Sequence, residues 1–147
     1  MKEIGDELIL TGAWFLLLGT LTSAVGVSSK KIISEDFGRS LFAKGNAIEA
    51  FGNTIQAIGR EKLYKMEMDE NELTIMMGSW IQAAGNSTNT IATTLERQGL
   101  EEEGHQLNAI GSVIQAIGAQ IETTGALKED IELTKIFLGF FHFNGAS

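Results

Sequence analysis

Acidic residues and histidine at helical spacing are the first candidates for chemistry in this chain. Glu102 and His105 stand three residues apart, the spacing that dimetal carboxylate bundles use to place two ligands on one helix face. Such a centre needs two pairs of this kind and a carboxylate from each of two further helices. Here the pair occurs once, in the run EEEGH, and Glu49 and Glu122 are the only carboxylates inside the apolar stretches. We therefore interpret the run as an acidic helix start and expect no metal and no cofactor.

Other catalytic chemistry lacks the residues that it needs. The chain has no cysteine, which excludes disulfides, thiolate zinc sites and thiol catalysis, and its two histidines are His105 and His142. No phosphate-binding loop, nucleophile elbow or dinucleotide fingerprint is present. A net charge of -8 disfavours binding to the phosphate backbone of nucleic acids. We predict a protein that is not an enzyme, with no small-molecule substrate evident and no nucleic-acid partner.

Glycine recurs every seven residues, and this pattern itself repeats every 33 residues. One register without gaps aligns four copies, 5–37, 38–70, 71–103 and 104–136, followed by a tail at 137–147. We interpret all 147 residues as a single domain. Each glycine costs a helix interior about 1 kcal/mol relative to alanine, a cost that is offset if helix backbones pack closely. The glycines predicted to form such a helix-packing seam are Gly12, Gly19, Gly45, Gly52, Gly59, Gly78, Gly85, Gly111, Gly118 and Gly125.

Large apolar residues occupy two further positions of each heptad and should flank the seam. When glycine takes the first position, Ile48 and Ile55 take the fourth, and Phe51 and Ile58 take the seventh. This is the pattern of an amphipathic helix, and a seven-residue period keeps it in register with a neighbouring helix. The predicted helices cover about 4–29, 35–64, 70–98 and 101–125, with a short helical or extended segment at about 128–142.

Short polar connections join these helices and favour antiparallel neighbours. Ser34 is a candidate N-cap for the second helix, and Asp69 or Asn71 for the third. The predicted fold is all-α, an antiparallel (up-down) four-helix bundle of homologous glycine-heptad helices with a short C-terminal tail.

A membrane is the main alternative environment. Residues 8–27 are uncharged and precede Lys30 and Lys31, so this stretch is long enough to span a bilayer. The sister copies, however, carry asparagine and glutamine at positions such as Asn53 and Gln82, which are expensive in hydrocarbon. The eleven lysine and arginine residues also divide almost evenly between the two sides of a four-span arrangement. The start MKEIGDE lacks a basic region, so we expect a cytoplasmic protein whose first helix is the most buried, with a membrane location as the alternative.

Two further features indicate assembly. Helix faces that would normally carry charges instead carry asparagine, glutamine, serine and threonine, and we call them the amide strips. Amides can pack against copies of themselves without the desolvation cost of charges, so we expect these strips to meet other subunits in a homo-oligomer or filament. The tail is either a lid over the end of the bundle or a segment that docks on a partner. Its candidate docking residues are Phe137, Phe140, Phe141 and Phe143.

The stretches GNAIEAFGNTIQAIG, GSWIQAAGN and GSVIQAIG resemble a family of small repetitive proteins from Bacillus-type Firmicutes with recurring G-[NS]-x-[IL]-Q-A-x-G units. The resemblance implies a bacterial, non-catalytic repetitive protein and supplies no site residues. The first copy departs from it at Leu16, Leu17 and Leu18. The sequence therefore predicts a structural or self-associating bundle that packs through glycine seams, or else a small membrane-inserted or membrane-associated protein of pore-like or immunity type.

Overall fold

The protein is described by a computed structural model that covers the backbone of residues 2–144 and the side chains of residues 2–135. Four helices make up this part of the chain, and no strand occurs within it: α1 Lys2–Ile32, α2 Glu35–Glu67, α3 Glu70–Arg97 and α4 Glu101–Asn144. The all-α prediction is confirmed.

Capping residues define the short turns between the helices. The side-chain oxygen of Ser34 accepts a hydrogen bond from the Phe37 backbone N–H at 3.1 Å, and Asp69 Oδ1 accepts one from the Asn71 N–H at 2.8 Å. Both predicted N-caps are present, each satisfying one amide that the first helical turn leaves free. In the turn before α4, Gly99 has φ of 90°, a left-handed conformation that glycine adopts without a steric penalty.

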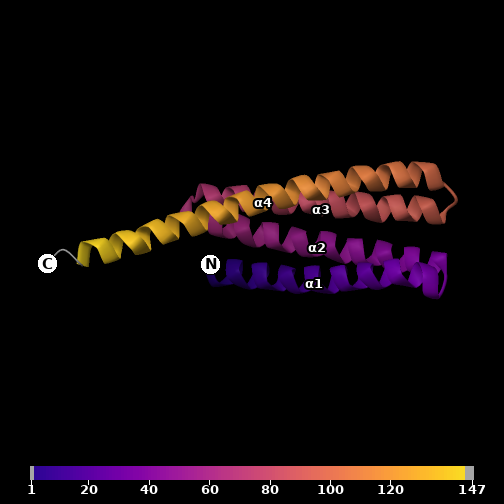
Figure 1. The fold of residues 1–147 in the computed structure, drawn as a ribbon, viewed down its shortest axis with the longest axis horizontal. Coiled ribbons are helices and arrows are strands. Elements are labelled where there is room, and N and C mark those ends of the chain that lie inside the picture. Colours follow the sequence, from indigo (N-terminus) through magenta and orange to yellow (C-terminus); the bar gives the residue numbers. More distant parts are fainter. Residues whose placement is uncertain (1, 145–147) are drawn as a thin grey trace.

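Consecutive helices run antiparallel and pack side by side (Figure 1). The contacts join α1 to α2, α2 to α3, and α3 to α4. In the described part of the chain, no Cα atom of α1 lies within 8 Å of α3 or α4, and none of α2 lies within 8 Å of α4. The up-down bundle is therefore open on one side, between its first and last helices.

The C-terminal segment differs from the prediction. The segment expected as a separate element at about 128–142 is continuous with α4, whose end extends beyond the other three helices (Figure 1). No proline and no glycine occurs between Gly125 and Gly139, so nothing in this stretch breaks the helix.

The prediction that the first helix is the most buried is wrong. Leu10 and Trp14 are 61% and 60% exposed, and the buried residues of α1 are glycines together with Ser29. The physical reason is topological, because α1 packs against α2 alone. Among the described helices, α1 is also the one that is long and apolar enough, by length and composition, to cross a membrane.

Candidate functional site

Glycines of α1 and α2 form the first close contact between helices. An added Cβ on Gly12 would lie 2.6 Å from the Gly52 carbonyl oxygen, and one on Gly19 would lie 2.8 Å from that of Gly45. Real Cβ atoms do not approach other atoms this closely. The two backbones therefore meet at a distance that only glycine permits.

The contact between α3 and α4 repeats this arrangement in the same register. A Cβ on Gly78 would lie 2.7 Å from the Gly118 carbonyl oxygen, and one on Gly85 would lie 2.8 Å from that of Gly111. Gly59 packs against Gly5, and Gly125 packs against the backbone of Asn71. All ten glycines assigned to the seam are buried at these two contacts, which we call the glycine seams. Each glycine seam is thus filled within one chain.

Polar side chains fill the third contact, between α2 and α3, which we call the polar seam. It is built from the residues that directly follow the glycines, such as Asn46 and Asn53 on α2 and Ser79 and Asn86 on α3, all at most 3% exposed. Thr90 Oγ1 donates to the Ala43 carbonyl oxygen across this seam at 3.3 Å. The small size of these side chains allows close packing, and the amide oxygens of Asn46 and Asn86 both accept hydrogen bonds from Gln115 Nε2 of α4.

Ion pairs hold both ends of the polar seam. At one end Arg60 Nη1 contacts Glu72 Oε1 at 3.0 Å. At the other end Arg39 contacts Glu96 at 3.5 Å and Glu101 at 3.1 Å, so that it also ties α4 to α2. Glycine spacing alone did not reveal these residues. The available signal was that charged residues follow the first and last glycines in copy two.

A second ion pair at the Arg39 end is exposed and responds to pH. Asp36 accepts hydrogen bonds from Arg97 at 2.8 and 3.4 Å, and these bonds lower the pKa of the Asp36 carboxyl below its usual value. Because the folded-state pKa is lowered, the pair contributes above the unfolded-state pKa of Asp36. This contribution is lost as pH falls through the lowered value.

Some buried polar atoms of the polar seam have no hydrogen-bond partner within the described residues. Thr93 is fully buried, and its Oγ1 is one of these atoms. Replacing Thr93 with valine, which has nearly the same shape, should raise the free energy of unfolding by about 1 kcal/mol, because an unpaired hydroxyl is removed from the interior.

The neighbouring residue supplies the control for this prediction. Thr94 is exposed, and its Oγ1 donates to the Thr90 carbonyl oxygen at 2.8 Å, so Thr94→Val should leave the stability nearly unchanged. Chemical unfolding followed by circular dichroism compares the two variants. A Thr93→Val protein that is less stable than the Thr94→Val protein would show that the hydroxyl of Thr93 is needed in the interior.

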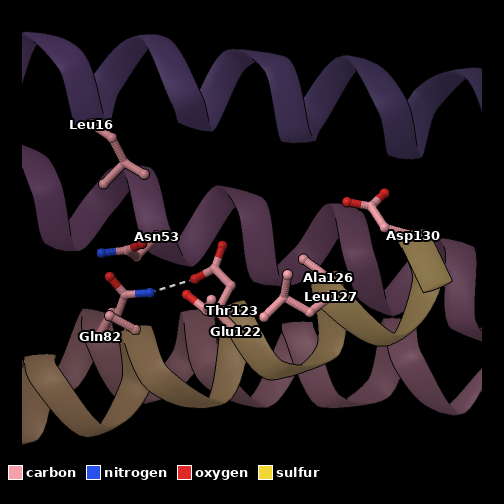
Figure 2. A pocket seen from close by; sticks show the side chains of 9 residues that line it. Leu16, Asn53, Gln82, Glu122, Thr123, Ala126, Leu127 and Asp130 are labelled. Carbon is pink, nitrogen blue, oxygen red and sulfur yellow. Dashed lines mark hydrogen bonds between the residues drawn. The ribbon is translucent and has the colours of Figure 1, made fainter.

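An open groove of about 440 Å³ runs beside the polar seam, with α1 on one wall and α4 on the other. Figure 2 shows Leu16 reaching down from α1 above Asn53, while Gln82 donates a hydrogen bond to Glu122 on the facing wall. The α4 wall continues through Thr123, Ala126, Leu127 and Asp130. The groove is the space that a closed bundle would fill with contacts between α1 and α4.

Large apolar side chains cover the outside of the molecule rather than its interior. Of the four largest fully buried side chains, Asn53, Thr93 and Ser79 are polar, and Ile75 is the apolar one. Exposed apolar side chains lie on all four helices, in their central segments, and we call them the apolar belt: Leu10, Trp14, Leu17, Leu18, Leu21, Val25, Phe51, Ile58, Met77, Trp80, Ile91, Ile110, Val113 and Ile117. Polarity is therefore inverted relative to a water-soluble bundle.

One sequence-based expectation is wrong in consequence. The amide strips were expected to meet other subunits, but Asn53, Asn86 and Asn89 are buried between helices of the same chain. Phe51, expected beside the seam, does lie there, with its ring 5.0 Å from that of Phe15 on α1, yet Phe51 and Ile58 remain 54% and 38% exposed. The reason is that the polar seam occupies the helix face next to the glycines, which turns the seventh heptad position outward.

The remaining candidate residues do not come together as a site. His105 Nδ1 lies 2.8 Å from the Glu101 carbonyl oxygen, while Glu102 accepts a hydrogen bond from Gln106. Among the described residues, no group of three or more histidine, aspartate or glutamate side chains could hold a metal ion. The side chains of the four tail residues Phe137, Phe140, Phe141 and Phe143 lie outside the described residues.

Comparison with known proteins gives a family but no activity. A model of a family of unknown function (DUF6944) matches residues 7–141. No curated protein and no solved structure matches the chain.

Proposed function

The chain belongs to this family of unknown function, and we propose that it is a non-catalytic helical protein that inserts into a membrane. The observation that carries the proposal is the inverted polarity, with the apolar belt outside and the amides of the polar seam inside. A bilayer favours this arrangement, because the apolar side chains then face lipid while the polar groups lie inside the protein, away from hydrocarbon. The bacterial source implied by the repeat motif is part of the same proposal.

The dimensions of the uncharged segments support insertion. Residues 8–29 of α1 and 73–95 of α3 carry no charge, and at 1.5 Å per residue these segments are about 33 Å and about 35 Å long. The hydrocarbon core of a bilayer is about 30 Å thick. In α2 the corresponding segment, residues 45–59, contains one charged residue, Glu49, which accepts a hydrogen bond from Ser23 of α1.

Most of the amides that weigh against a membrane location are buried in the structure. Composition counts every residue of a helix, including side chains that do not face its surroundings. Asn53, Gln56, Asn86 and Asn89 are all buried in the polar seam or beside it, so they would not face lipid, whereas Gln120 of α4 is exposed. Small residues at the glycine seams are also how membrane helices approach closely.

A water-soluble assembly explains the apolar belt less well. A finite soluble oligomer needs an outer surface rich in charges, but the central segments of α1, α3 and α4 present none. Because the apolar belt lies on all four helices, a soluble assembly would have to cover a face of each of them to keep it from water.

A soluble, self-associating protein of the cytoplasm is the second candidate, and one observation favours it. Lys44 is exposed on α2 beside Gly45, whose partner Gly19 lies near the middle of α1. In a bilayer this ammonium would have to reach the interface along its own aliphatic stem. In a soluble assembly it would simply face water.

Flotation separates the two candidates. The protein, made without detergent in the presence of liposomes, should rise with the vesicles in a density gradient and stay with them after washing at high pH. Lipid that covers the apolar belt explains both results. A monodisperse oligomer that stays at the bottom of the gradient and needs no detergent would contradict insertion and support the soluble candidate.

A further inference from the structure

We infer that a second copy of this chain docks on the open side of the bundle. In this contact α4 of one copy packs on α1 of the next, with the same geometry as the contact between α2 and α3. The 33-residue repeat makes the four helices equivalent, and positions that are buried or half-buried in the polar seam are exposed on the outer helices. We call them the edge faces. On α1 the edge face is Leu10, Ala13, Leu17, Thr20, Ala24 and Val27, and on α4 it is Ala109, Ser112, Ala116, Ala119, Thr123 and Ala126.

The register of this contact follows from the polar seam. Between α2 and α3, Thr90 donates to the Ala43 carbonyl oxygen. The residue one repeat after Thr90 is Thr123 on α4, and the residue one repeat before Ala43 is Leu10 on α1. The same register therefore places the Thr123 hydroxyl against the Leu10 carbonyl of the next copy. At the centre of the contact, Ala116 then lies opposite Leu17.

Side-chain size favours the pairing of α4 with α1 over pairs of identical helices. The edge face of α4 consists of alanine, serine and threonine, whereas that of α1 carries Leu10 and Leu17. Small residues on one helix leave room for the large residues of the other. Pairing α1 with another α1 would set Leu17 against its own copy, and pairing α4 with another α4 would leave a gap at Ala116.

Charge at one end of the contact agrees with the same pairing. The antiparallel register brings Lys30 and Lys31, at the end of α1, beside the acidic start of α4 at 101–103. The polar seam has ion pairs at its ends in the same manner, Arg39 with Glu96 and Arg60 with Glu72. At the other end of the new contact the register sets Asp130 of α4 opposite Glu3 of α1, with Lys128 as the nearby cation.

The groove gives the incoming helix a place to bind. Thr123 and Ala126, both on the edge face of α4, line it opposite Leu16 (Figure 2). A second copy would cover this wall and extend the polar interior past Gln82 and Glu122. The inference rests on the proposed function in one respect, that the pair forms within the lipid that covers the rest of the apolar belt.

Cross-linking between single-cysteine variants tests the contact, and the chain suits it because it has no cysteine of its own. Leu17→Cys and Ala116→Cys proteins are mixed in liposomes and treated with a short bismaleimide. The mixture should give about tenfold more cross-linked dimer than either variant alone, since a contact holds the two thiols at high effective concentration. A mixture of Leu18→Cys with Ala116→Cys is the matched control, because Leu18 is exposed at the same height of α1 but lies about 100° around the helix from Leu17.

Four other outcomes would overturn the inference, and a fifth would overturn the proposed function alone. Dimer from Leu17→Cys alone means that α1 pairs with α1, and dimer from Ala116→Cys alone means that α4 pairs with α4. An internal cross-link in the double variant, without dimer, means that the chain closes on itself. No cross-link in a protein that floats with liposomes means that lipid covers the edge faces. A cross-linked mixture that does not float would leave this contact standing and overturn membrane insertion.

Discussion

A protein in which arginine replaces Leu18 and Leu21 should no longer float with liposomes. Both leucines belong to the apolar belt, at 54% and 55% exposure, in the middle of the uncharged stretch of α1. An arginine near the centre of a membrane helix costs about 3 kcal/mol, so the two together remove most of the gain from inserting α1. Because neither side chain is buried in the protein, the fold itself should tolerate the exchange.

The matched control carries the same exchange outside the belt. Ile131 and Leu133 are equally exposed, at 53% and 59%, but they stand on α4 beyond its uncharged segment. Arginine at these two positions should leave flotation unchanged. Circular dichroism in one detergent establishes that both proteins are folded. If both double variants float as the parent does, lipid does not face this part of α1.

Leucine in place of Gly85 should separate α3 from α4 and lower the free energy of unfolding by about 3 kcal/mol through overpacking. A Cβ at this position would already lie 2.7 Å from the Gln115 backbone nitrogen, and backbone cannot move aside as a flexible side chain can. Even alanine should destabilise the protein here. That result would reverse the usual preference of a helix interior for alanine over glycine, about 1 kcal/mol.

The residue before Gly85 supplies the control for this substitution. Ala84 is exposed on the same turn of α3, so Ala84→Leu adds the same bulk where nothing opposes it. Unfolding of both variants in one detergent, followed by circular dichroism, gives the comparison. Equal stability of the two proteins would mean that α3 and α4 do not meet at Gly85.

The inverted polarity links these two predictions. Helices that expose the apolar belt cannot rely on a large apolar core, and the buried apolar side chains within the described residues are mostly alanine. Close backbone contact at the glycine seams and pairing of polar groups at the polar seam take over that role. The first prediction probes what surrounds the belt, and the second probes what holds the helices together without a core.

Sequence periodicity and the short polar connections were sufficient to predict the helices and their antiparallel order. Residue type indicated the cap at Ser34 and left Asp69 and Asn71 as alternatives for the third helix, of which the structure uses Asp69. A seven-residue repeat specifies which residues share one helix face, because the geometry of an α-helix is local. Capping is local as well, since it depends on residues within one turn. The end of α4 was missed, because the segment at about 128–142 was predicted as a separate element although no proline or glycine lies between Gly125 and Gly139.

What each face meets could be decided only by the tertiary structure. Periodicity groups Gly52, Asn53 and Phe51 on neighbouring faces of α2, but it does not say which face meets α1, which meets α3 and which remains outside. In the structure the glycine and the asparagine are buried and the phenylalanine is exposed. The choice depends on the angle between two successive helix contacts, a non-local property. That angle turned the amides inward, turned the apolar belt outward and left the edge faces of α1 and α4 open.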